Sequence, residues 1–252
     1  MKKVNSDVAY ENIRKRILSG EYPPGYSLVT EGLSAVTGVS RTPVREALHR
    51  LEADGLVSIR ARLGASVKKM DMKEFREMCD LRLALEGHAT GLAALNHSQF
   101  DLREINFALE SMRGLTERLN AAETEHPLID ELVREDVRFH IAIMTAAKND
   151  LMKEEILRLH LVNRIVFGPV NSAGGSAVAL QSKAERDVNR RKVLISHDEI
   201  YTAIARSDAG AAKNAMERHI QDIIDKSLLI MAHAGSVHMS RELTDEELVY
   251  NG

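Results

Sequence analysis

The apolar positions at the start of the chain predict three helices followed by a hairpin. Residues 6–18 have apolar side chains at helical spacing, and the breaker sequence GEYPPGYS ends that helix. A short helix is expected over 30–36 with Thr30 as its N-cap, and another begins after Ser40 and ends at Gly55. The sequences LVSIR and ASVKK then alternate on either side of a turn, as two short strands do. Helix, short helix, helix and hairpin in this order describe a winged helix-turn-helix.

From Asp71 onward the pattern changes to long helical periods with few breaking residues. Asp101 is expected to cap the second of these helices, and the Gly- and Ala-rich stretch 168–182 is expected to be a loop. The predicted helices cover 72–96, 101–121, 128–147, 150–167, 186–207 and 209–233. The predicted fold class is therefore mainly α, with an N-terminal winged helix-turn-helix (1–70), a C-terminal all-α antiparallel helical bundle (71–233) and a polar tail (234–252).

The composition is that of a globular protein without a membrane segment. Apolar residues make up 44% and charged residues 28% of the 252 residues, and no apolar run reaches the about 18 residues that a membrane-spanning helix needs. The N-terminus lacks the apolar segment of a signal peptide, and the single cysteine, Cys79, allows no disulfide framework. We therefore expect a cytoplasmic protein with no membrane partner.

Positive charge is concentrated in the predicted N-terminal domain. Residues 1–70 carry twelve Lys or Arg against seven Asp or Glu, a net charge of +5, whereas the rest of the chain carries −8. A locally basic surface attracts phosphates even when the whole protein is weakly acidic. The charge distribution therefore favours a nucleic-acid partner for this domain.

The predicted helix after Val39 carries side chains suited to reading DNA. In a helix-turn-helix, the first residues of the second helix face base edges in the major groove, and here these are Ser40, Arg41, Thr42 and, one turn on, Arg45. Arginine can donate two hydrogen bonds to guanine, which discriminates against other bases by about 1–3 kcal/mol. Serine and threonine hydroxyl groups suit a phosphate oxygen. The alternative is an amphipathic helix whose arginines only solvate its outer face, and the order of the flanking elements favours the DNA-reading interpretation.

The sequence GVSRTPVREALHRLEADGLV, preceded by the loop SGEYPPGYSL, resembles the DNA-binding domain of the GntR superfamily of bacterial transcription regulators. The resemblance implies that the basic helix contacts operator DNA and that the hairpin, or wing, reaches the minor groove. The residues that it implicates are Ser40, Arg41, Thr42, Arg45, Arg60, Arg62 and Gly64. One position departs from the pattern, because the fatty-acid-responsive member of the FadR branch has a DNA-contacting arginine where this chain has Glu31. This departure implies a different operator.

The long helices place four potential metal ligands on apolar stripes. In LVREDVRFHIAIM, Asp136 and His140 are four residues apart and therefore lie on one face of a helix, beside apolar residues. His197 and His219 occur on apolar stripes further along the chain. Burying such groups without partners would cost several kcal/mol, so they must be paired, hydrated or bound to an ion. Three imidazoles and a carboxylate would make a transition-metal site, while the alternative is that chance has placed a few of the ten histidines near a core.

Three further segments resemble the FCD ligand-binding domain of the FadR branch: LRLALEGHATGLAA, EDVRFHIAIM and SHDEIYTAIARSDAGAAKNAMERHI. In metal-containing members an Asp-x-x-x-His pair and two later histidines hold the ion. The resemblance therefore implies a divalent transition metal (Zn²⁺, Ni²⁺ or Mn²⁺) bound by Asp136, His140, His197 and His219. The two resemblances together span about residues 6 to 233.

Arg82 is an unexpected residue on an otherwise apolar helix face, which it shares with Met78, Leu85 and Ala89. It either extends its head group to solvent, pairs with Glu86, or binds a ligand carboxylate. The resemblance favours the last interpretation, because the arginine of this segment often faces the effector cavity in FCD domains. A metal ion together with an arginine suits a small organic acid. Asn163 is a further candidate for the lining of that cavity.

These observations predict a regulator of transcription. We expect a repressor that acts as a homodimer on a palindromic double-stranded DNA operator. A small carboxylate metabolite bound at the metal site would control its operator binding. We expect no enzymatic activity, because no nucleophile or general base accompanies the predicted metal ligands. Two alternatives are a metal-dependent hydrolase or lyase with an accessory DNA-binding domain and a metal-free helical dimerisation module.

Overall fold

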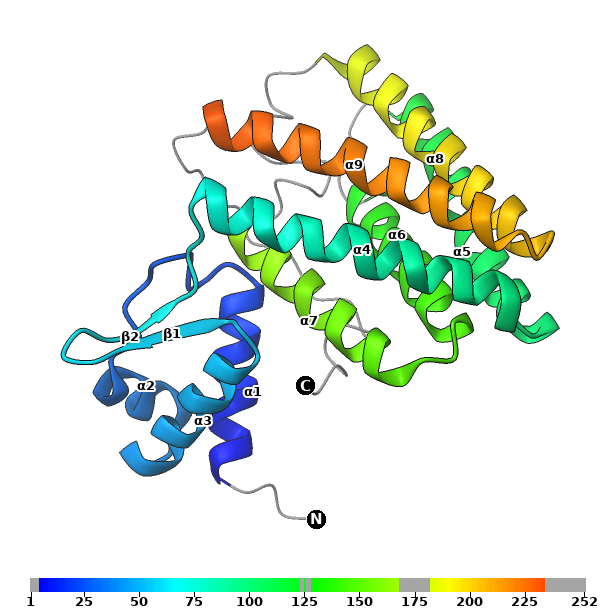
Figure 1. Cartoon of the computed structure of the whole chain (residues 1–252). Coiled ribbons are helices and arrows are strands. Elements are labelled where there is room, and N and C mark those ends of the chain that lie inside the picture. Colours follow the sequence, from blue (N-terminus) through cyan, green and yellow to red (C-terminus); the bar gives the residue numbers. More distant parts are fainter. Residues whose placement is uncertain (1–4, 123–124, 126–127, 168–181, 234–252) are drawn as a thin grey trace. The chain divides into compact units, whose positions relative to one another are not determined.

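The computed structural model describes the backbone of residues 5–122, 125, 128–167 and 182–233, and the side chains of these residues except 163–167 and 229–233. The chain divides into two compact units, and in the N-terminal part the first ends at Asp71 and the second begins at Met72. Of the elements shown in Figure 1, helix α7 is divided between the two units after Leu159.

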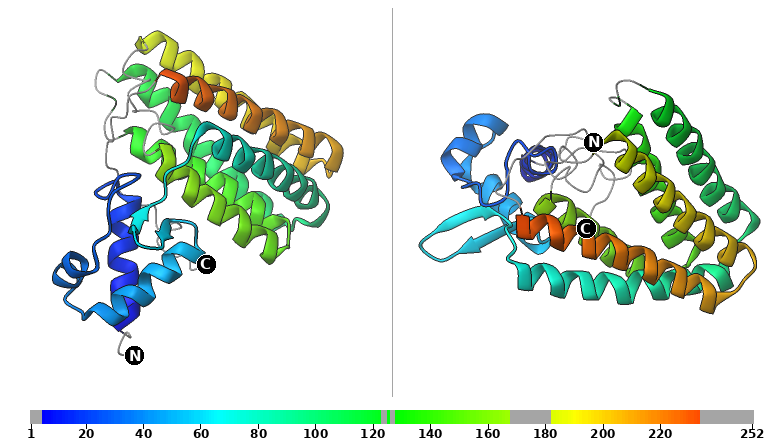
Figure 2. Two further views of the ribbon diagram at one scale, coloured as in Figure 1. Left: turned by 60° about the vertical axis from the view of Figure 1, so that its left-hand side comes forward. Right: turned by 90° about the horizontal axis from the view of Figure 1, so that it is seen from above.

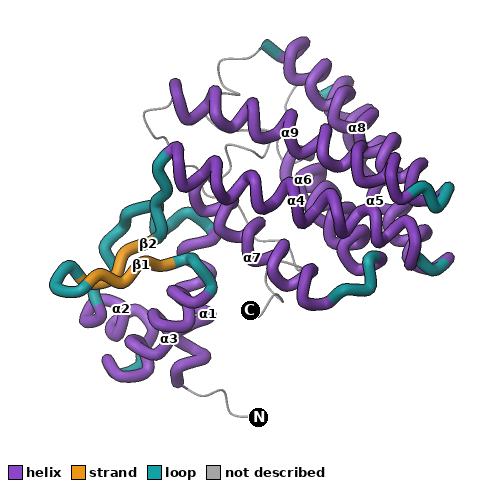
Figure 3. Tube along the Cα trace, in the orientation of Figure 1, coloured by secondary structure: helices purple, strands orange, loops and turns teal. Residues whose placement is uncertain are grey.

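The N-terminal unit is a winged helix-turn-helix, as the sequence predicts. Its elements are α1 (Asn5–Leu18), α2 (Thr30–Thr37), α3 (Arg41–Ala53), β1 (Val57–Arg60) and β2 (Gly64–Val67). Helix α3 packs against α1, α2 and β1. The apolar residues of this core include Ile13, Ile17, Leu33, Leu48 and Leu51. The strands pair in antiparallel register from Val57 opposite Val67 to Arg60 opposite Gly64, and Figure 3 shows these two strands as the only ones in the described chain.

Two predicted helix caps were wrong by one to three residues. Helix α2 is preceded by Val29 as N-cap, so Thr30 is its first helical residue. Helix α5 is capped by Ser98, whose Oγ accepts a hydrogen bond from the backbone N–H of Asp101 at 3.2 Å. The carboxylate of Asp101 in turn accepts from the backbone N–H of Ser98 at 2.7 Å. Asp101 is therefore the third residue of a capping box and not the cap itself.

The second unit consists of long helices, which confirms the predicted all-α class. They are α4 (Met72–Asn96), α5 (Gln99–Ala121), α6 (Leu128–Ala146), the part of α7 (Asp150–Phe167) up to Leu159, α8 (Lys183–Ala205) and α9 (Ala209–His233). Five of them pack in a closed cycle in the order α4, α9, α8, α5, α6 and back to α4. Figure 2 shows α4 and α9 side by side along their length. Side chains that point into this cycle come from helices far apart in the sequence.

Close contact between α4 and α9 depends on a glycine. A Cβ atom placed on Gly87 would lie 2.7 Å from Cγ of Glu217 on α9. Any larger residue at this position would have to displace that side chain or separate the two helices.

Among the described residues, no helix is long and apolar enough to cross a membrane.

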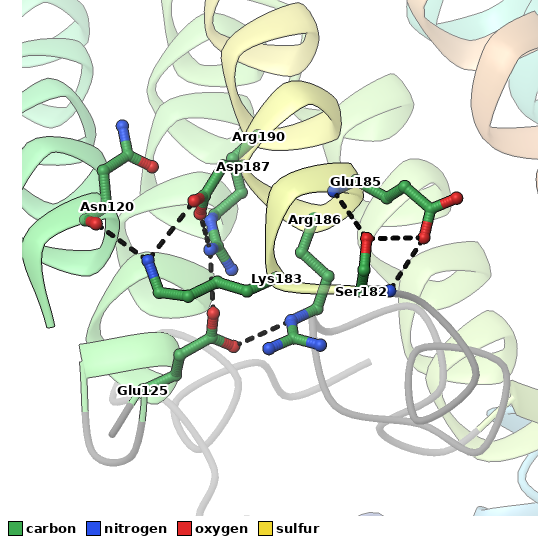
Figure 4. A network of polar contacts seen from close by, with 8 residues as sticks. All are labelled: Asn120, Glu125, Ser182, Lys183, Glu185, Arg186, Asp187 and Arg190. Carbon is green, nitrogen blue, oxygen red and sulfur yellow. Dashed lines mark hydrogen bonds and ion pairs between the residues drawn. The ribbon is translucent and has the colours of Figure 1, made fainter. Parts of the chain in front are cut away.

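A network of ion pairs joins the start of α8 to the end of α5 (Figure 4). Arg190 Nη2 donates a hydrogen bond to Glu125 Oε1 at 2.9 Å, and Arg186 Nε donates to Glu125 Oε2 at 3.0 Å. Lys183 Nζ donates to the backbone carbonyl of Asn120 at 2.7 Å. Burial alone would raise the pKa of Glu125, but the two guanidinium groups outweigh it and lower that pKa. The network therefore helps to keep α8 against α5 and the helix cycle closed.

Candidate metal centre and nucleic-acid interface

The three histidines predicted as metal ligands lie together inside the helical unit. His140 comes from α6, His197 from α8 and His219 from α9, and their exposed fractions are 7%, 0% and 3%. One ring nitrogen from each lies within 4.8 Å of the other two. The Nε2 atoms of His197 and His219 are 3.3 Å apart. Three buried imidazoles from three helices therefore converge on one point.

Asp136 lies one turn before His140 on α6 and approaches His197, although among the described residues the ligand atoms within 4.8 Å of one another belong to the three histidines alone. Its Oδ1 atom is 3.6 Å from His197 Nε2, and its side chain is 41% exposed. The three imidazoles are almost fully buried, so Asp136 is the solvent-accessible member of the group. Its role as a fourth ligand stays a prediction, based on its approach to one of the three histidines.

The donor atoms of this cluster fit a divalent transition metal. Three imidazole nitrogens and one carboxylate oxygen are ligand types that such ions take in proteins. Two nitrogens bound to one tetrahedral ion at about 2.0–2.1 Å lie about 3.3 Å apart, which matches the separation of the His197 and His219 Nε2 atoms. The described residues are therefore compatible with a metal ion held by the predicted ligands.

Burial keeps two of these rings in the neutral form that binds metals. Desolvation, followed by the neighbouring His219 and His140, lowers the pKa of His197 well below its usual value. Desolvation also lowers the pKa of His219 to about 4, against a smaller opposite effect of Glu86. A neutral imidazole has a lone pair for an ion, whereas an imidazolium has none. A cation would therefore meet two neutral rings at neutral pH and would not have to displace protons from imidazolium groups there.

Three residues around the cluster were not assigned to the site from the sequence. Ser196 Oγ lies 2.9 Å from Nδ1 of His219, and the ring of Phe139 lies 4.6 Å from that of His197. Glu86, which is fully buried on α4, places Oε2 at 4.0 Å from Nδ1 of His140. Glu86 was considered only as a partner of Arg82, because its approach to α6 depends on how the helices pack. The sequence gives no indication of the roles of Ser196 and Phe139, because each contacts a histidine ring on another helix.

Arg82 and Glu86 form a buried ion pair on α4. Arg82 Nε donates a hydrogen bond to Glu86 Oε1 at 2.8 Å, and the two side chains are 5% and 0% exposed. The Nη nitrogens of Arg82 have no hydrogen-bond partner in the described part of the chain. The pairing and the ligand-binding interpretations are therefore compatible, because one edge of the guanidinium group holds Glu86 and the other can still donate. Asn163, the other predicted effector residue, lies on α7, and its side chain is outside the described residues.

The predicted base-contacting residues lie at the exposed start of α3. Ser40 occupies the N-cap position without a side-chain capping bond, so its hydroxyl is available to another acceptor or donor. Arg41 forms an ion pair with Glu31 of α2, whereas Arg45 has no ion pair or hydrogen bond with any described residue. Thr42 is exposed beside them. The helix thus presents one arginine bound by a carboxylate and one that can turn freely toward a ligand.

The wing residues are exposed at the turn between β1 and β2. Arg60 ends β1, Gly64 begins β2, and Arg62 lies in the turn between them. Arg62 and Gly64 have φ values of 67° and 84°, so the chain reverses through left-handed backbone conformations. Leu63 between them is 77% exposed. The wing therefore presents two guanidinium groups and an apolar tip to its surroundings.

Two family models cover most of this chain. The model described as "Bacterial regulatory proteins, gntR family" matches residues 5–67, and the FCD domain model matches residues 77–222. The first match coincides with the winged helix-turn-helix and the second with the helices that carry the histidine cluster.

Curated proteins similar to this chain align with most of its length. The chain is 26% identical over 233 residues to the HTH-type transcriptional regulator LutR of Bacillus subtilis, covering 83% of this chain and 94% of LutR. It is 26% identical over 221 residues to the HTH-type transcriptional repressor RspR of Escherichia coli, covering 87% of each.

Among solved structures, E. coli McbR/YncC aligns with a TM-score of 0.65 and 20% identity, covering 92% of this chain and all of that one. Lar, which controls the expression of the Listeria monocytogenes agr system, aligns with a TM-score of 0.56 and 18% identity, covering 91% and 99%. At these identities the structural likeness supports the fold.

Proposed function

Because the chain belongs to the gntR family of bacterial regulatory proteins and carries an FCD domain, we propose that it is a repressor whose operator binding is controlled by a small carboxylate bound at a metal ion. That it is a DNA-binding transcription regulator follows from the family and from relatives such as LutR. The repressor role is supported by the name of RspR. The metal and the carboxylate are supported by the helical unit itself.

The observation that carries the proposal is the buried cluster of His140, His197 and His219. A core that only needed apolar packing would not place three desolvated imidazoles within 4.8 Å of one another. With Asp136 they would hold a divalent ion, which when bound supplies a Lewis-acidic centre for carboxylate or hydroxyl oxygens. Zn²⁺, Ni²⁺ and Mn²⁺ all accept this ligand set.

Arg82 supports an anionic effector. Its guanidinium group is buried and uses Nε for Glu86, so the Nη edge can donate two parallel hydrogen bonds to a carboxylate. Glu86 keeps the charge of Arg82 balanced when no ligand is bound. We propose that the effector spans from the ion to Arg82, and that a neutral compound of the same shape binds far more weakly.

On the DNA side, we propose that Arg45 and Arg41 read base edges, with Ser40 and Thr42 at phosphates. Arg60, Arg62 and Gly64 would place the wing in the minor groove. Glu31 would then compete with DNA for Arg41, so that Arg41 contributes less than Arg45 to operator affinity. Two copies of the chain on a palindromic site would double these contacts, and such a regulator would act in the cytoplasm.

The relatives are regulators, and we therefore propose no catalytic role for the metal site. A metal-dependent hydrolase or lyase would turn over candidate acids in the presence of the ion. Release of operator DNA without consumption of the acid is the outcome that the regulator proposal requires.

The decisive experiment combines metal analysis with DNA binding on the full chain. An operator selected from random duplexes is titrated by fluorescence anisotropy with and without small hydroxy- and dicarboxylic acids, and the matching amides serve as neutral controls. We expect stoichiometric transition metal by elemental analysis and an acid-dependent loss of DNA affinity. His197→Ala should reduce both the metal content and the acid response.

His88→Ala is the matched control, because His88 is an exposed histidine on α4 outside the cluster. It should change neither the metal content nor the acid response. Full metal occupancy in His197→Ala would remove His197 from the site. If the wild-type protein contains no metal and no acid changes its DNA binding, the proposal is wrong. The helical unit would then be a metal-free dimerisation module.

A further inference from the structure

The hydroxyl group of Ser196 lies between a backbone carbonyl and one of the cluster histidines. Ser196 Oγ is 2.7 Å from the carbonyl oxygen of Val193 and 2.9 Å from Nδ1 of His219. A serine hydroxyl has one hydrogen to donate, and a carbonyl oxygen can only accept. The hydroxyl hydrogen therefore goes to Val193, and Oγ accepts a hydrogen bond from His219. This assignment places the ring hydrogen of His219 on Nδ1.

The contact between the two buried rings leads to the same assignment independently. His197 Nε2 and His219 Nε2 are 3.3 Å apart, so one of them donates and the other accepts when no ion lies between them. His197 Nδ1 is buried and has no hydrogen-bond partner among the described residues. An N–H group left there would cost about 1–3 kcal/mol, so His197 carries its hydrogen on Nε2. It then donates to His219 Nε2, which must have a lone pair.

We propose that Ser196 is a positioning residue that holds His219 in its Nδ1–H form and so presents the Nε2 lone pair to the metal ion. The inference rests on the metal site proposed above, and Ser196 itself does not touch the ion. A partner on the far nitrogen of a metal-bound histidine fixes both the tautomer and the ring orientation. His197 has no such partner in the described chain, so of these two rings His219 is the one that is prepared for the ion in advance.

Two variants of matched shape test the role of the hydroxyl group. Ser196→Thr keeps it, whereas Ser196→Val has nearly the same outline and lacks it. Ring ¹⁵N NMR on the metal-free full-length protein reports the tautomer of His219, and competition with a chelator reports the affinity for Zn²⁺. We expect Nδ1–H in the wild type and in Ser196→Thr, with equal Zn²⁺ affinity. In Ser196→Val we expect a population with Nε2–H and an affinity lower by about 10- to 100-fold.

Equal Zn²⁺ affinity of the two variants would overturn the proposal, and so would an Nε2–H tautomer of His219 in the wild-type protein. The tautomer measurement needs only the wild type, so a folding defect in Ser196→Val does not remove the test. If the wild type binds no Zn²⁺, the proposed metal site is wrong. In that case the His219 tautomers of the wild type and the variants still show whether Ser196 fixes the Nδ1–H form of this ring.

Discussion

The buried His219 should make the stability of the metal-free protein depend on pH. Desolvation lowers its pKa to about 4, whereas an unfolded chain has a histidine pKa of about 6.5. The unfolded state therefore binds the proton more readily, and the contribution of this ring is complete above about pH 6.5 and is lost as the pH falls toward 4. The sign is opposite to that of a histidine stabilised by a carboxylate, which would gain stability in acid.

The size of the effect follows from the two pKa values. The pKa of His219 is about 6.5 in the unfolded state and about 4 in the folded state. This difference lowers the free energy of unfolding by about 2 kcal/mol between about pH 8 and about pH 5, for His219 alone. No discount for solvent screening is needed, because the side chain is 3% exposed. His197 acts in the same direction, since its pKa is also lowered. The loss is therefore a large fraction of the about 5–15 kcal/mol that stabilises a typical domain.

The assay compares the wild type with His219→Gln after removal of metal by a chelator. The chain has no tryptophan, so urea unfolding is followed by far-UV circular dichroism, which the long helices dominate. We expect the wild type to lose about 2 kcal/mol more than His219→Gln between about pH 8 and about pH 5. Equal pH dependence of the two proteins would refute the reasoning. Titration of the His219 ring near its usual pKa in NMR would refute it as well.

Other side chains give predictions of similar size. Arg45→Ala should lower operator affinity by about 5- to 150-fold, which is the loss of about 1–3 kcal/mol of base contact, and unchanged affinity in fluorescence anisotropy would remove Arg45 from the interface. Glu86→Gln should destabilise the protein by about 3 kcal/mol in urea unfolding, because it leaves Arg82 buried without its counter-charge. An unchanged unfolding midpoint would contradict this. Burial would raise the pKa of Asp101, but hydrogen bonds from Lys148 and its capping box lower it to about 2. Asp101→Asn should therefore cost about 2 kcal/mol at neutral pH, and its stability curve should approach that of the wild type as the pH falls from about 4 to about 2.

The sequence predicted the helices well because their signals are local. Apolar spacing, glycine and the change of period near Asp71 all act within a few residues, and the observed helices begin and end within about three residues of the predicted ones. The error at Asp101 arose where two polar residues compete for one cap, whereas α2 begins after Val29, which has no capping side chain. At Ser98 the capping box was decided by a hydrogen bond back from Asp101, a reciprocal contact that the choice of a single cap residue overlooks.

The candidate site was predictable only in part, for a related reason. Spacing placed Asp136 and His140 on one face of α6, and the apolar stripes marked His197 and His219 as residues that needed partners. The contribution of Glu86 depends on which turns of α4 and α6 meet, and that of Ser196 on which turns of α8 and α9 meet. No helical period encodes these registers. The partners of a buried polar group lie across helix interfaces, so they become visible only when the helices are packed.

The placement of the effector residues on α4 suggests how the two activities are coupled. Only residues 68–71 separate the end of β2 from the start of α4, and Arg82 and Glu86 lie on that same helix. In the proposed function, a carboxylate that binds Arg82 would act on α4, and α4 is joined to the wing by these few residues. Coupling of about 1–3 kcal/mol would change operator affinity by about 5- to 150-fold, and it is necessarily reciprocal. Saturating operator DNA should therefore change the affinity for the effector by the same factor, measured by calorimetry. An effector affinity that ignores DNA would show that the acid binds without controlling the DNA-reading helix.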